Sequence, residues 1–329
     1  MKNSIGLIVN PRSGGDVRRA VAAAGRSTLE DKVSIVRRVV LGAIAVGVRN
    51  FFVNYEPMQI VRRATETIRD IEINYVNKSM TFTEEDSTIA ARLLKEREVP
   101  CVAVLGGDGT NRAVTKGWQN IPIIPISTGT NNAFPVFIEP TVAGTALGLV
   151  AIRAVSLADV SNPAKLIHVS GKEEITDLAL IDAVAVDDPY VGSLELFDSK
   201  TMVMALLTRA DPAGIGFSSV GGHLKPLSSG DDSALFVRFA PVGSGRDLTK
   251  VKAATAPGHY ETIGIEEVKI LSFDEEISVS GEVLLAFDGE RKLRVPKGGT
   301  VRLCVRRDGP WVIDPTKTVS LGRHVMVDV

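Results

Sequence analysis

One acidic residue among glycines is the part of the sequence best suited to chemistry. Gly106-Gly107-Asp108-Gly109-Thr110 directly follows an apolar run, residues 102–105, and directly precedes a short segment with helical periodicity. Glycine lets the backbone turn sharply and lets phosphate oxygens approach amide groups, and the following helix would present free N–H groups to an anion. Asp108 shares the sign of a phosphate's charge, so it would instead accept the proton of an attacking hydroxyl or hold a magnesium ion. The alternative is a tight turn in which Asp108 caps the helix.

Two further loops of small polar residues follow predicted strands. Asn10-Pro11-Arg12-Ser13-Gly14-Gly15 comes after the apolar run 5–9, and Ser127-Thr128-Gly129-Thr130-Asn131-Asn132 comes after the run 123–126. The carboxyl ends of parallel strands open on one edge of a sheet, where ligands bind in open α/β folds. We therefore expect these two loops to share a crevice with the glycine motif.

Up to about residue 155 the pattern predicts an α/β layer that would carry the three loops. Short, continuous apolar runs are typical of strands buried in a parallel sheet, and segments with helical periodicity lie between them. The expected strands are 5–9, 51–53, 102–105 and 123–126, and the expected helices are 39–48, 83–98 with Thr83 as its cap, and one that begins near Pro140.

From about residue 157 the pattern changes to short alternating strands. Residues 301–306 alternate apolar and polar side chains, as a half-buried strand does. Ser280-Gly281, Asp288-Gly289 and Gly298-Gly299 are turn signals at short spacing, which predict hairpins. We expect residues 1–155 to form a Rossmann-like nucleotide-binding domain and residues 156–329 to form a mostly β domain for substrate binding and oligomerisation.

Composition narrows the choice of partners. The 329 residues suit two domains, and 38 Lys and Arg against 39 Asp and Glu leave no basic excess to bind nucleic acid or an anionic membrane. Cys101 and Cys304 lie in apolar runs without metal-ligand spacing, so we expect buried free thiols and neither a disulfide framework nor a zinc site. No signal-peptide pattern or apolar run of membrane-spanning length occurs, so we expect a cytoplasmic protein.

Other nucleotide and hydrolase motifs are absent from the sequence. It contains no G-x-x-x-x-G-K-[ST] motif, no G-x-G-x-x-G motif and no G-x-S-x-G motif. A P-loop enzyme and a serine hydrolase are thereby disfavoured.

The three loops, in this order and at these separations, resemble the family of ATP-NAD kinases and acetoin-catabolism protein X. The wider superfamily includes diacylglycerol and sphingosine kinases. In the second half, residues 211–218 (DPAGIGFS) and 221–226 (GGHLKP) look like diverged forms of two NAD kinase segments, TPTGSTAYS and GGPIVHP. Residues 179–182 (ALID) fall where those enzymes carry ALNE or ALND, and residues 287–290 (FDGE) fall where they carry a DGQ hairpin.

The resemblance implies an ATP- and Mg²⁺-dependent kinase with a Rossmann-like N-terminal domain and a C-terminal β-sandwich. It makes Asp108 the catalytic base toward the acceptor hydroxyl. The residues expected to bind the nucleotide are Asn10, Gly106, Gly107, Gly109, Thr110, Thr128, Gly129, Asn131 and Asn132. The residues expected to bind the acceptor are Asp182, Gly214, Gly216 and Glu290. A homodimer or homotetramer is expected on the resemblance alone.

The identity of the acceptor stays open at this point. NAD(H) is the leading candidate, but Ile181 stands where NAD kinases have Asn, and Ile215 and Gly216 stand where they have Ser and Thr. Another hydroxylated metabolite is the alternative, as in the acetoin-associated branch. A lipid kinase is favoured only by Asp288-Gly289-Glu290, which also reads as a hairpin turn. A regulatory protein that binds nucleotide without turnover is the non-enzymatic alternative.

Overall fold

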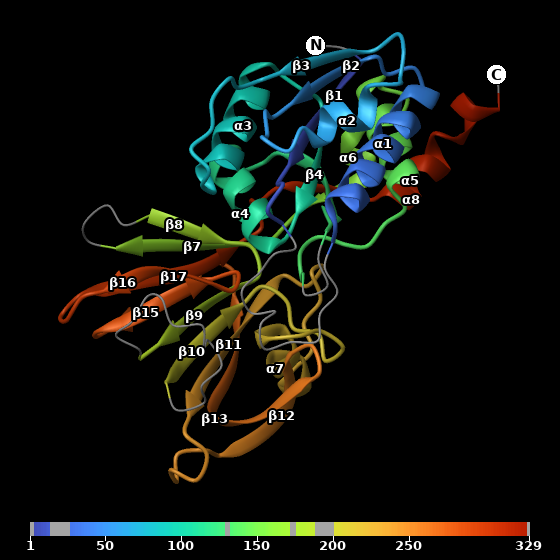
Figure 1. Cartoon of the computed structure of the whole chain (residues 1–329). Coiled ribbons are helices and arrows are strands. Elements are labelled where there is room, and N and C mark those ends of the chain that lie inside the picture. Colours follow the sequence, from blue (N-terminus) through green and yellow to red (C-terminus); the bar gives the residue numbers. More distant parts are fainter. Residues whose placement is uncertain (1–2, 14–26, 129–131, 172–175, 188–200, 328–329) are drawn as a thin grey trace. The chain divides into compact units, whose positions relative to one another are not determined.

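The chain divides into two compact units that are best described separately. The structure, a computed structural model, describes residues 3–13, 27–128, 132–171, 176–187 and 201–327. Of these, residues 3–13, 27–164 and 309–327 belong to the first unit, and those from 165 to 308 belong to the second (Figure 1).

The first unit is built on a mostly parallel sheet of seven strands in the order β3-β2-β1-β4-β5-β18-β6. All neighbours are parallel except β6, which runs antiparallel to β18. The strands are β1 Ser4–Val9, β2 Asn50–Val53, β3 Glu72–Tyr75, β4 Val102–Gly106, β5 Pro122–Ser127, β6 Ser161–Pro163 and β18 Trp311–Ile313. The four strands expected from apolar runs are confirmed. β3 was not expected, because its residues are only half-buried or exposed and leave no apolar run.

Helices of the first unit begin where capping residues place them. Thr28 and Asp31 form a reciprocal capping box at the start of α1, and Glu139 caps α5, whose first residue is Pro140. The helix expected to begin at Thr83 begins two residues later, at Glu85. Its N-cap is Glu84, and the Thr83 hydroxyl accepts the N–H of Glu85. The helices are α1 Leu29–Ala45, α2 Ile60–Thr65, α3 Glu85–Glu96, α4 Asp108–Gly117, α5 Pro140–Ala151, α6 Leu157–Val160, α8 Pro315–Leu321 and the 3₁₀ helix η2 Arg323–Met326.

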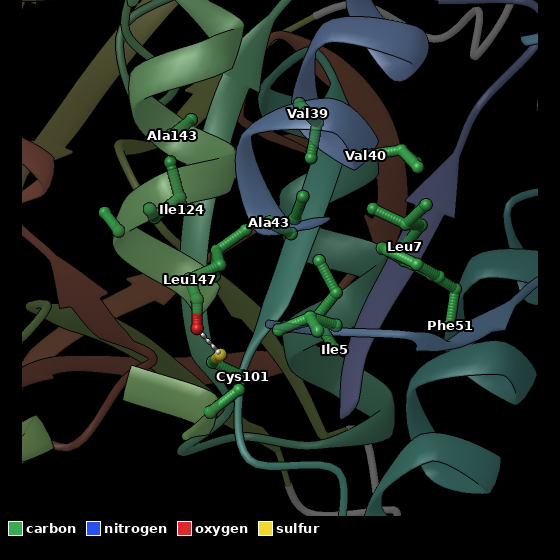
Figure 2. Packing of buried hydrophobic residues seen from close by; sticks show 14 of the residues in the cluster. Ile5, Leu7, Val39, Val40, Ala43, Phe51, Cys101, Ile124, Ala143 and Leu147 are labelled. Carbon is green, nitrogen blue, oxygen red and sulfur yellow. Dashed lines mark hydrogen bonds between the residues drawn. The ribbon is translucent and has the colours of Figure 1, made fainter. Parts of the chain in front are cut away.

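Helices α1 and α5 cover one face of the sheet and pack closely on each other. Ile5, Leu7 and Phe51 of the sheet share one fully buried cluster with Val39, Val40 and Ala43 of α1 (Figure 2). Gly42 permits this approach, because a Cβ there would lie 2.1 Å from the carbonyl oxygen of Thr141 on α5. The expected core segment 39–48 therefore belongs to α1 and its exit.

The expected buried free thiols are confirmed. Cys101 and Cys304 are both buried and unpaired. The Cys101 thiol donates a hydrogen bond to the carbonyl oxygen of Leu147, drawn as the dashed line in Figure 2. Burial raises the pKa of both thiols, so neither is suited to nucleophilic chemistry.

The second unit contains two antiparallel sheets packed face to face. One has the order β12-β13-β11-β10-β9-β15-β16 and the other the order β14-β17-β7-β8, and a shared apolar core contains Leu206, Phe236 and Leu285 from the first and Ile167 and Leu303 from the second. The expected mostly β sandwich is thus confirmed. Its elements are β7 Leu166–Gly171, β8 Thr176–Ala179, β9 Asp182–Val186, β10 Met202–Leu207, α7 Phe217–Leu224, β11 Ser233–Ala240, β12 Thr249–Ala256, β13 His259–Ser272, β14 Ile277–Ser280, β15 Val283–Phe287, β16 Glu290–Val295 and β17 Thr300–Arg306.

Only one of the three turn signals makes a hairpin. Asp288 and Gly289, with φ of 49° and 81°, join the paired strands β15 and β16. Ser280-Gly281 and Gly298-Gly299 instead connect strands of different sheets, so the expectation of hairpins there was wrong. A glycine with positive φ permits a sharp turn, but it does not decide which strand the chain pairs with next.

The division between the units also differs from the expected one at residue 155. Residues 156–164 stay with the first unit, and residues 309–327 return to it. β18 extends the parallel sheet beside β5 and pairs with β6 on its other side, and α8 packs on α5. The apolar run of β18 covers three residues only, too short to stand out in the sequence.

Candidate functional site

The glycine motif forms a tight corner between β4 and α4. Gly106 ends the strand, Gly107 is the N-cap of the helix, and Asp108 is its first residue. A Cβ on Gly106 would lie 2.4 Å from the side chain of Thr110, and one on Gly107 would lie 2.8 Å from the Asn132 side-chain oxygen. A side chain at either position would therefore crowd the packing at this corner, where the first turn of α4 begins.

Asp108 does not cap the helix that it begins. Its Oδ1 accepts the backbone N–H groups of Phe134 at 2.8 Å and Ala133 at 3.1 Å, and Oδ2 accepts that of Ala133 at 3.0 Å. These bonds hold the carboxylate in one orientation. The side chain thus joins the glycine corner to the segment after the third loop.

The first loop is tied to the same corner by Asn10. Its side-chain N–H donates to the Thr110 hydroxyl at 2.8 Å, and its side-chain oxygen accepts the Arg12 backbone N–H at 2.9 Å. The Ser13 hydroxyl donates to the Asn10 carbonyl oxygen. One amide side chain therefore sets both the turn of its own loop and the distance of that loop from α4.

The third loop meets the other two through hydroxyl and amide groups. The Thr128 hydroxyl donates to that of Ser13 at 2.7 Å, and the Asn132 side chain donates to the Ser127 hydroxyl at 2.9 Å. Gly129 and Asn131 lie outside the described residues. The three loops are therefore joined at one edge of the sheet, where Asn10, Gly106, Gly107, Thr110, Thr128 and Asn132 are linked by hydrogen bonds or close packing.

Two features of this edge had little signal in the sequence. Asn54, after β2, accepts the Val9 N–H at 2.7 Å and donates to the Val9 carbonyl at 3.0 Å, so its side chain fixes the end of β1. Arg112 on α4 is fully buried and lies 3.6 Å from Glu84. A single Asn or Arg in an otherwise ordinary segment gives no pattern, so only the three-dimensional structure shows these contacts.

A second group of titratable side chains lies where β2 and β3 end. Burial raises the pKa of Glu56, and backbone N–H groups at the start of α2, such as those of Ile60 and Val61, oppose the shift. Partial burial and the nearby Glu56 carboxylate raise the pKa of Tyr75, whose ring meets that of Tyr55 edge-on at 6.0 Å between centroids. Tyr75 is the last residue of β3, and Tyr55 and Glu56 come soon after β2, so all three lie at the same edge of the sheet as the glycine motif.

In the second unit, two of the expected acceptor-binding residues, Asp182 and Glu290, lie at one end of the larger sheet, and Gly214 and Gly216 lie in a separate loop. The first residue of β9, Asp182, pairs with Leu207 at the end of β10, and Gly214 and Gly216 follow in the loop that leads to α7. Gly216 has a φ of 82° and donates its N–H to the Ala254 carbonyl. The Asp182 carbonyl accepts the Asp288 N–H, which brings the hairpin turn before Glu290 to the same end.

Asp288 has a structural role in that end. Its carboxylate is buried and accepts the backbone N–H groups of Leu180, Ile181 and Asp182 at 2.7–3.2 Å. The following Glu290 is exposed. The hairpin interpretation of the Asp-Gly-Glu sequence, which competes with the lipid-kinase interpretation, therefore agrees with the geometry.

No described group of three or more His, Cys, Asp or Glu side chains could hold a metal ion by itself. Magnesium keeps several water ligands and needs only one or two carboxylates beside phosphate oxygens. The single carboxylate of Asp108, at the glycine corner, would meet that requirement as the protein's share of such a site. Within the described part of the chain, every helix falls short of the length and apolarity needed to cross a membrane.

Comparison with known proteins agrees with the division into units. Residues 5–153 match the ATP-NAD kinase N-terminal domain, and residues 165–308 match the acetoin catabolism protein X C-terminal domain. The second match has the same limits as the second unit. The two halves of the chain thus carry the features of the two family branches that the motifs resembled.

Two individual proteins extend these matches over nearly the whole chain. The acetoin catabolism protein X of Cupriavidus necator is 32% identical over 305 residues, which cover 88% of this chain and 84% of that protein. The crystal structure of yeast NADH kinase complexed with NADH superposes with a TM-score of 0.54 at 12% identity, covering 97% of this chain and 86% of that one. The second likeness is one of fold.

Proposed function

Because the chain belongs to the acetoin catabolism protein X family and has the NAD kinase fold, we propose that it is an ATP-dependent phosphotransferase that acts on a hydroxyl of a small molecule. The observation that carries this proposal is the position of Asp108. Its carboxylate lies at the carboxyl edge of a parallel sheet, at the first turn of a helix, among loops joined to one another by Asn10, Thr128 and Asn132. In open α/β folds, ligands bind at this edge.

The residues around Asp108 suit a nucleotide triphosphate. The first turn of α4 supplies N–H groups and the positive end of a helix dipole, both of which favour phosphate oxygens. Ser13, Thr110 and Thr128 add hydroxyl groups at the same edge. Phosphoryl transfer needs mainly alignment and charge stabilisation rather than covalent help from the protein. When bound with ATP, Mg²⁺ would neutralise charge on the phosphate oxygens.

We assign to Asp108 the role of base toward the acceptor hydroxyl. Its bonds to Ala133 and Phe134 hold the carboxylate in one orientation at the start of α4. A base that is held in place before the substrate binds loses little entropy when the reaction begins. We place acceptor recognition on Asp182, Gly214, Gly216 and Glu290 of the second unit.

NAD(H) is the first acceptor to test, and another hydroxylated metabolite is the alternative. Two observations favour the alternative. The chain belongs to the acetoin catabolism protein X family. In addition, Ile181, Ile215 and Gly216 replace polar residues of NAD kinases and would leave groups of NAD without hydrogen-bond partners. The side chain of Ile181 is almost fully buried. The sequence Asp288-Gly289-Glu290 does not favour a lipid acceptor. Asp288 accepts the backbone N–H groups of Leu180 and Ile181, so this sequence already has a structural role as a hairpin turn.

The deciding experiment is a screen of the purified full chain with γ-labelled ATP and magnesium against NAD, NADH and a panel of hydroxylated metabolites and diacylglycerol. Transfer of label to any of the small molecules supports the proposal and identifies the acceptor. Binding of ATP without transfer to any compound would instead support a regulatory nucleotide-binding protein. Transfer to diacylglycerol alone would support a lipid kinase. Loss of ATP binding altogether would contradict the assignment of the site.

A further inference from the structure

A buried lysine lies behind the first loop, on the first turn of α1. Lys32 is only 4% exposed, and its ammonium group donates to the carbonyl oxygens of Pro11 at 2.6 Å and Ser13 at 2.7 Å. Lysine is rarely buried to this extent, because the removal of its charge from water costs free energy. The burial of an ammonium group at this place therefore has to be offset by specific contacts, such as its bonds to these two carbonyl oxygens.

Lys32 and the hydroxyl contacts use different groups of the same loop. The ammonium group binds the carbonyl oxygens of Pro11 and Ser13, whereas the Ser13 hydroxyl contacts Asn10 and Thr128. A carbonyl oxygen that faced a phosphate would repel it, since both carry negative charge. Two such oxygens are bonded to a cation here, which keeps them turned toward α1.

We propose that Lys32 is a positioning residue for nucleotide binding. It fixes the loop of residues 10–13 so that its side chains, rather than its carbonyl oxygens, are presented beside the first turn of α4. This inference rests on the proposed function, because it assumes that a nucleotide phosphate binds at this edge. Lys32 itself acts only through the loop.

The chain offers a matched control in the other unit. Lys165 is also 4% exposed, and it also donates to two backbone carbonyl oxygens, those of Ser228 and Ser233, both at 3.0 Å. Lys32→Met and Lys165→Met therefore remove the same chemistry, a buried ammonium bonded to two carbonyls, from two different loops. Both variants are expected to melt at a lower temperature than the unmodified chain.

Nucleotide affinity separates a positioning role from a merely structural one. We expect Lys32→Met to raise the Kd for ATP, measured by calorimetry on the full chain, on the order of 10- to 100-fold, as small displacements of binding groups do. Lys165→Met is expected to leave that Kd unchanged. In Lys32→Met the KM for the acceptor at saturating ATP should also stay as it is.

A second variant keeps the test decisive if Lys32→Met does not fold. Lys32→Arg retains a cation that can donate to both carbonyls but has a longer, planar head group, so it should displace the loop and give an intermediate Kd at nearly normal melting temperature. ATP affinity equal to that of the unmodified chain in a folded Lys32 variant would overturn the positioning role. Failure of the unmodified chain to bind ATP would overturn the proposed function itself, and this inference with it.

Discussion

The carboxylate of Asp108 accepts the backbone N–H of Phe134 at 2.8 Å, so the proposed base is also the anchor of the segment that follows the third loop. Anchoring depends on the acceptor oxygens, whereas basicity depends on the carboxylate charge. Oδ1 accepts two N–H groups, and Oδ2 accepts one. Substitutions at this position should therefore be chosen to change one role at a time.

Asp108→Asn separates basicity from anchoring. The Asn side-chain oxygen can keep both bonds made by Oδ1, whereas its NH₂ group cannot accept the Ala133 N–H, so stability should fall by only about 1 kcal/mol. Loss of the base should lower kcat by roughly a hundred- to ten-thousand-fold. Discontinuous assays with labelled ATP and the identified acceptor measure the rate, and thermal unfolding measures the stability.

Asp108→Ala is the comparison variant, because it removes the anchor as well as the base. It should weaken ATP binding in addition to turnover, whereas Asp108→Asn should bind ATP nearly as well as the unmodified chain. Near-normal turnover by Asp108→Asn would show that another group accepts the proton.

Gly107→Ala tests the contact between the glycine corner and Asn132. The new methyl group would lie 2.8 Å from the Asn132 side-chain oxygen, so the end of that side chain must shift, which strains its bond to Ser127. We expect a loss of about 1 kcal/mol in the free energy of unfolding, at the low end for overpacked sites because a side-chain end can move. In the Asn132→Ala background the same change should cost at least about 0.5 kcal/mol less, because the clash is gone.

ATP affinity in the same four proteins tests the role of Gly107 toward phosphate. Binding should stay weaker in Gly107→Ala than in its parent in both backgrounds, since the methyl group still occupies the helix entry. If affinity in the double variant equals that of Asn132→Ala alone, Gly107 serves only the contact with Asn132.

The sheet of the first unit could be predicted largely from the sequence. Strands such as β1 and β4 are apolar throughout, because both faces of a parallel sheet are covered by helices, and that leaves a continuous run in the sequence. β3 and β18 were not predicted, for two different reasons. β3 lies at the edge and carries half-exposed residues, and β18 is brought to β5 from the far end of the chain.

The candidate site was predictable where its residues share a local pattern. Asp108 and its glycines stand out because they lie within five consecutive positions. Asn54 and Lys32 reach the same edge from separate elements, and neither differs in type from ordinary polar residues at the end of a strand or in the first turn of a helix. Long-range contacts of this kind depend on how the elements pack, which local spacing does not encode.

Lys165 should make the stability of the protein depend on pH in the alkaline range. Burial, together with the nearby Arg307 and Arg209 charges, lowers its pKa to about 8, against partial compensation by Asp231 and Asp232. Between that pKa and the ordinary lysine value of 10.5, the unfolded chain binds more protons than the folded chain at this group. Its contribution to the free energy of unfolding therefore rises with pH from about 8 to about 10.5.

Urea unfolding at pH 7, 8, 9 and 10 measures this contribution when the unmodified chain is compared with Lys165→Met. The difference in the free energy of unfolding between the two should shift in favour of the unmodified chain as pH rises above 8. A difference that stays constant from pH 7 to 10 would mean that Lys165 keeps an ordinary pKa.

Asp288→Ala should destabilise the second unit strongly. Three buried or partly buried N–H groups, those of Leu180, Ile181 and Asp182, would lose their common acceptor. We expect a loss of about 2 to 5 kcal/mol, since buried donors without partners and bonds to charged groups are both costly to lose. Asp288→Asn keeps one acceptor oxygen and should lose less. Equal unfolding midpoints for Asp288→Ala and the unmodified chain would contradict the bonding pattern.

The residues that depart from NAD kinases predict weak activity on NAD. A site that lacks one polar partner leaves the corresponding group of the ligand buried without a hydrogen bond, which lowers both affinity and specificity. Ile181 is 2% exposed, and Ile215 is half-buried in the loop before α7. We expect the Michaelis constant for NAD to lie well above the usual upper range of about 1 mM.

Ile215→Ser should improve NAD phosphorylation, because it adds a hydroxyl at a position with room for one. Ile181→Asn with Ile215→Ser should improve it further, but only if thermal unfolding shows that the chain tolerates a polar group at the buried position 181. The measurement is kcat/KM for NAD in the three proteins beside that for the acceptor found by the screen. Efficient NAD phosphorylation by the unmodified chain would show that residues 179–182 and 211–218 do not correspond to the NAD kinase segments as aligned, and it would make NAD the assigned acceptor. No activity on NAD with rapid turnover of another hydroxyl compound would place the specificity with the acetoin-associated branch.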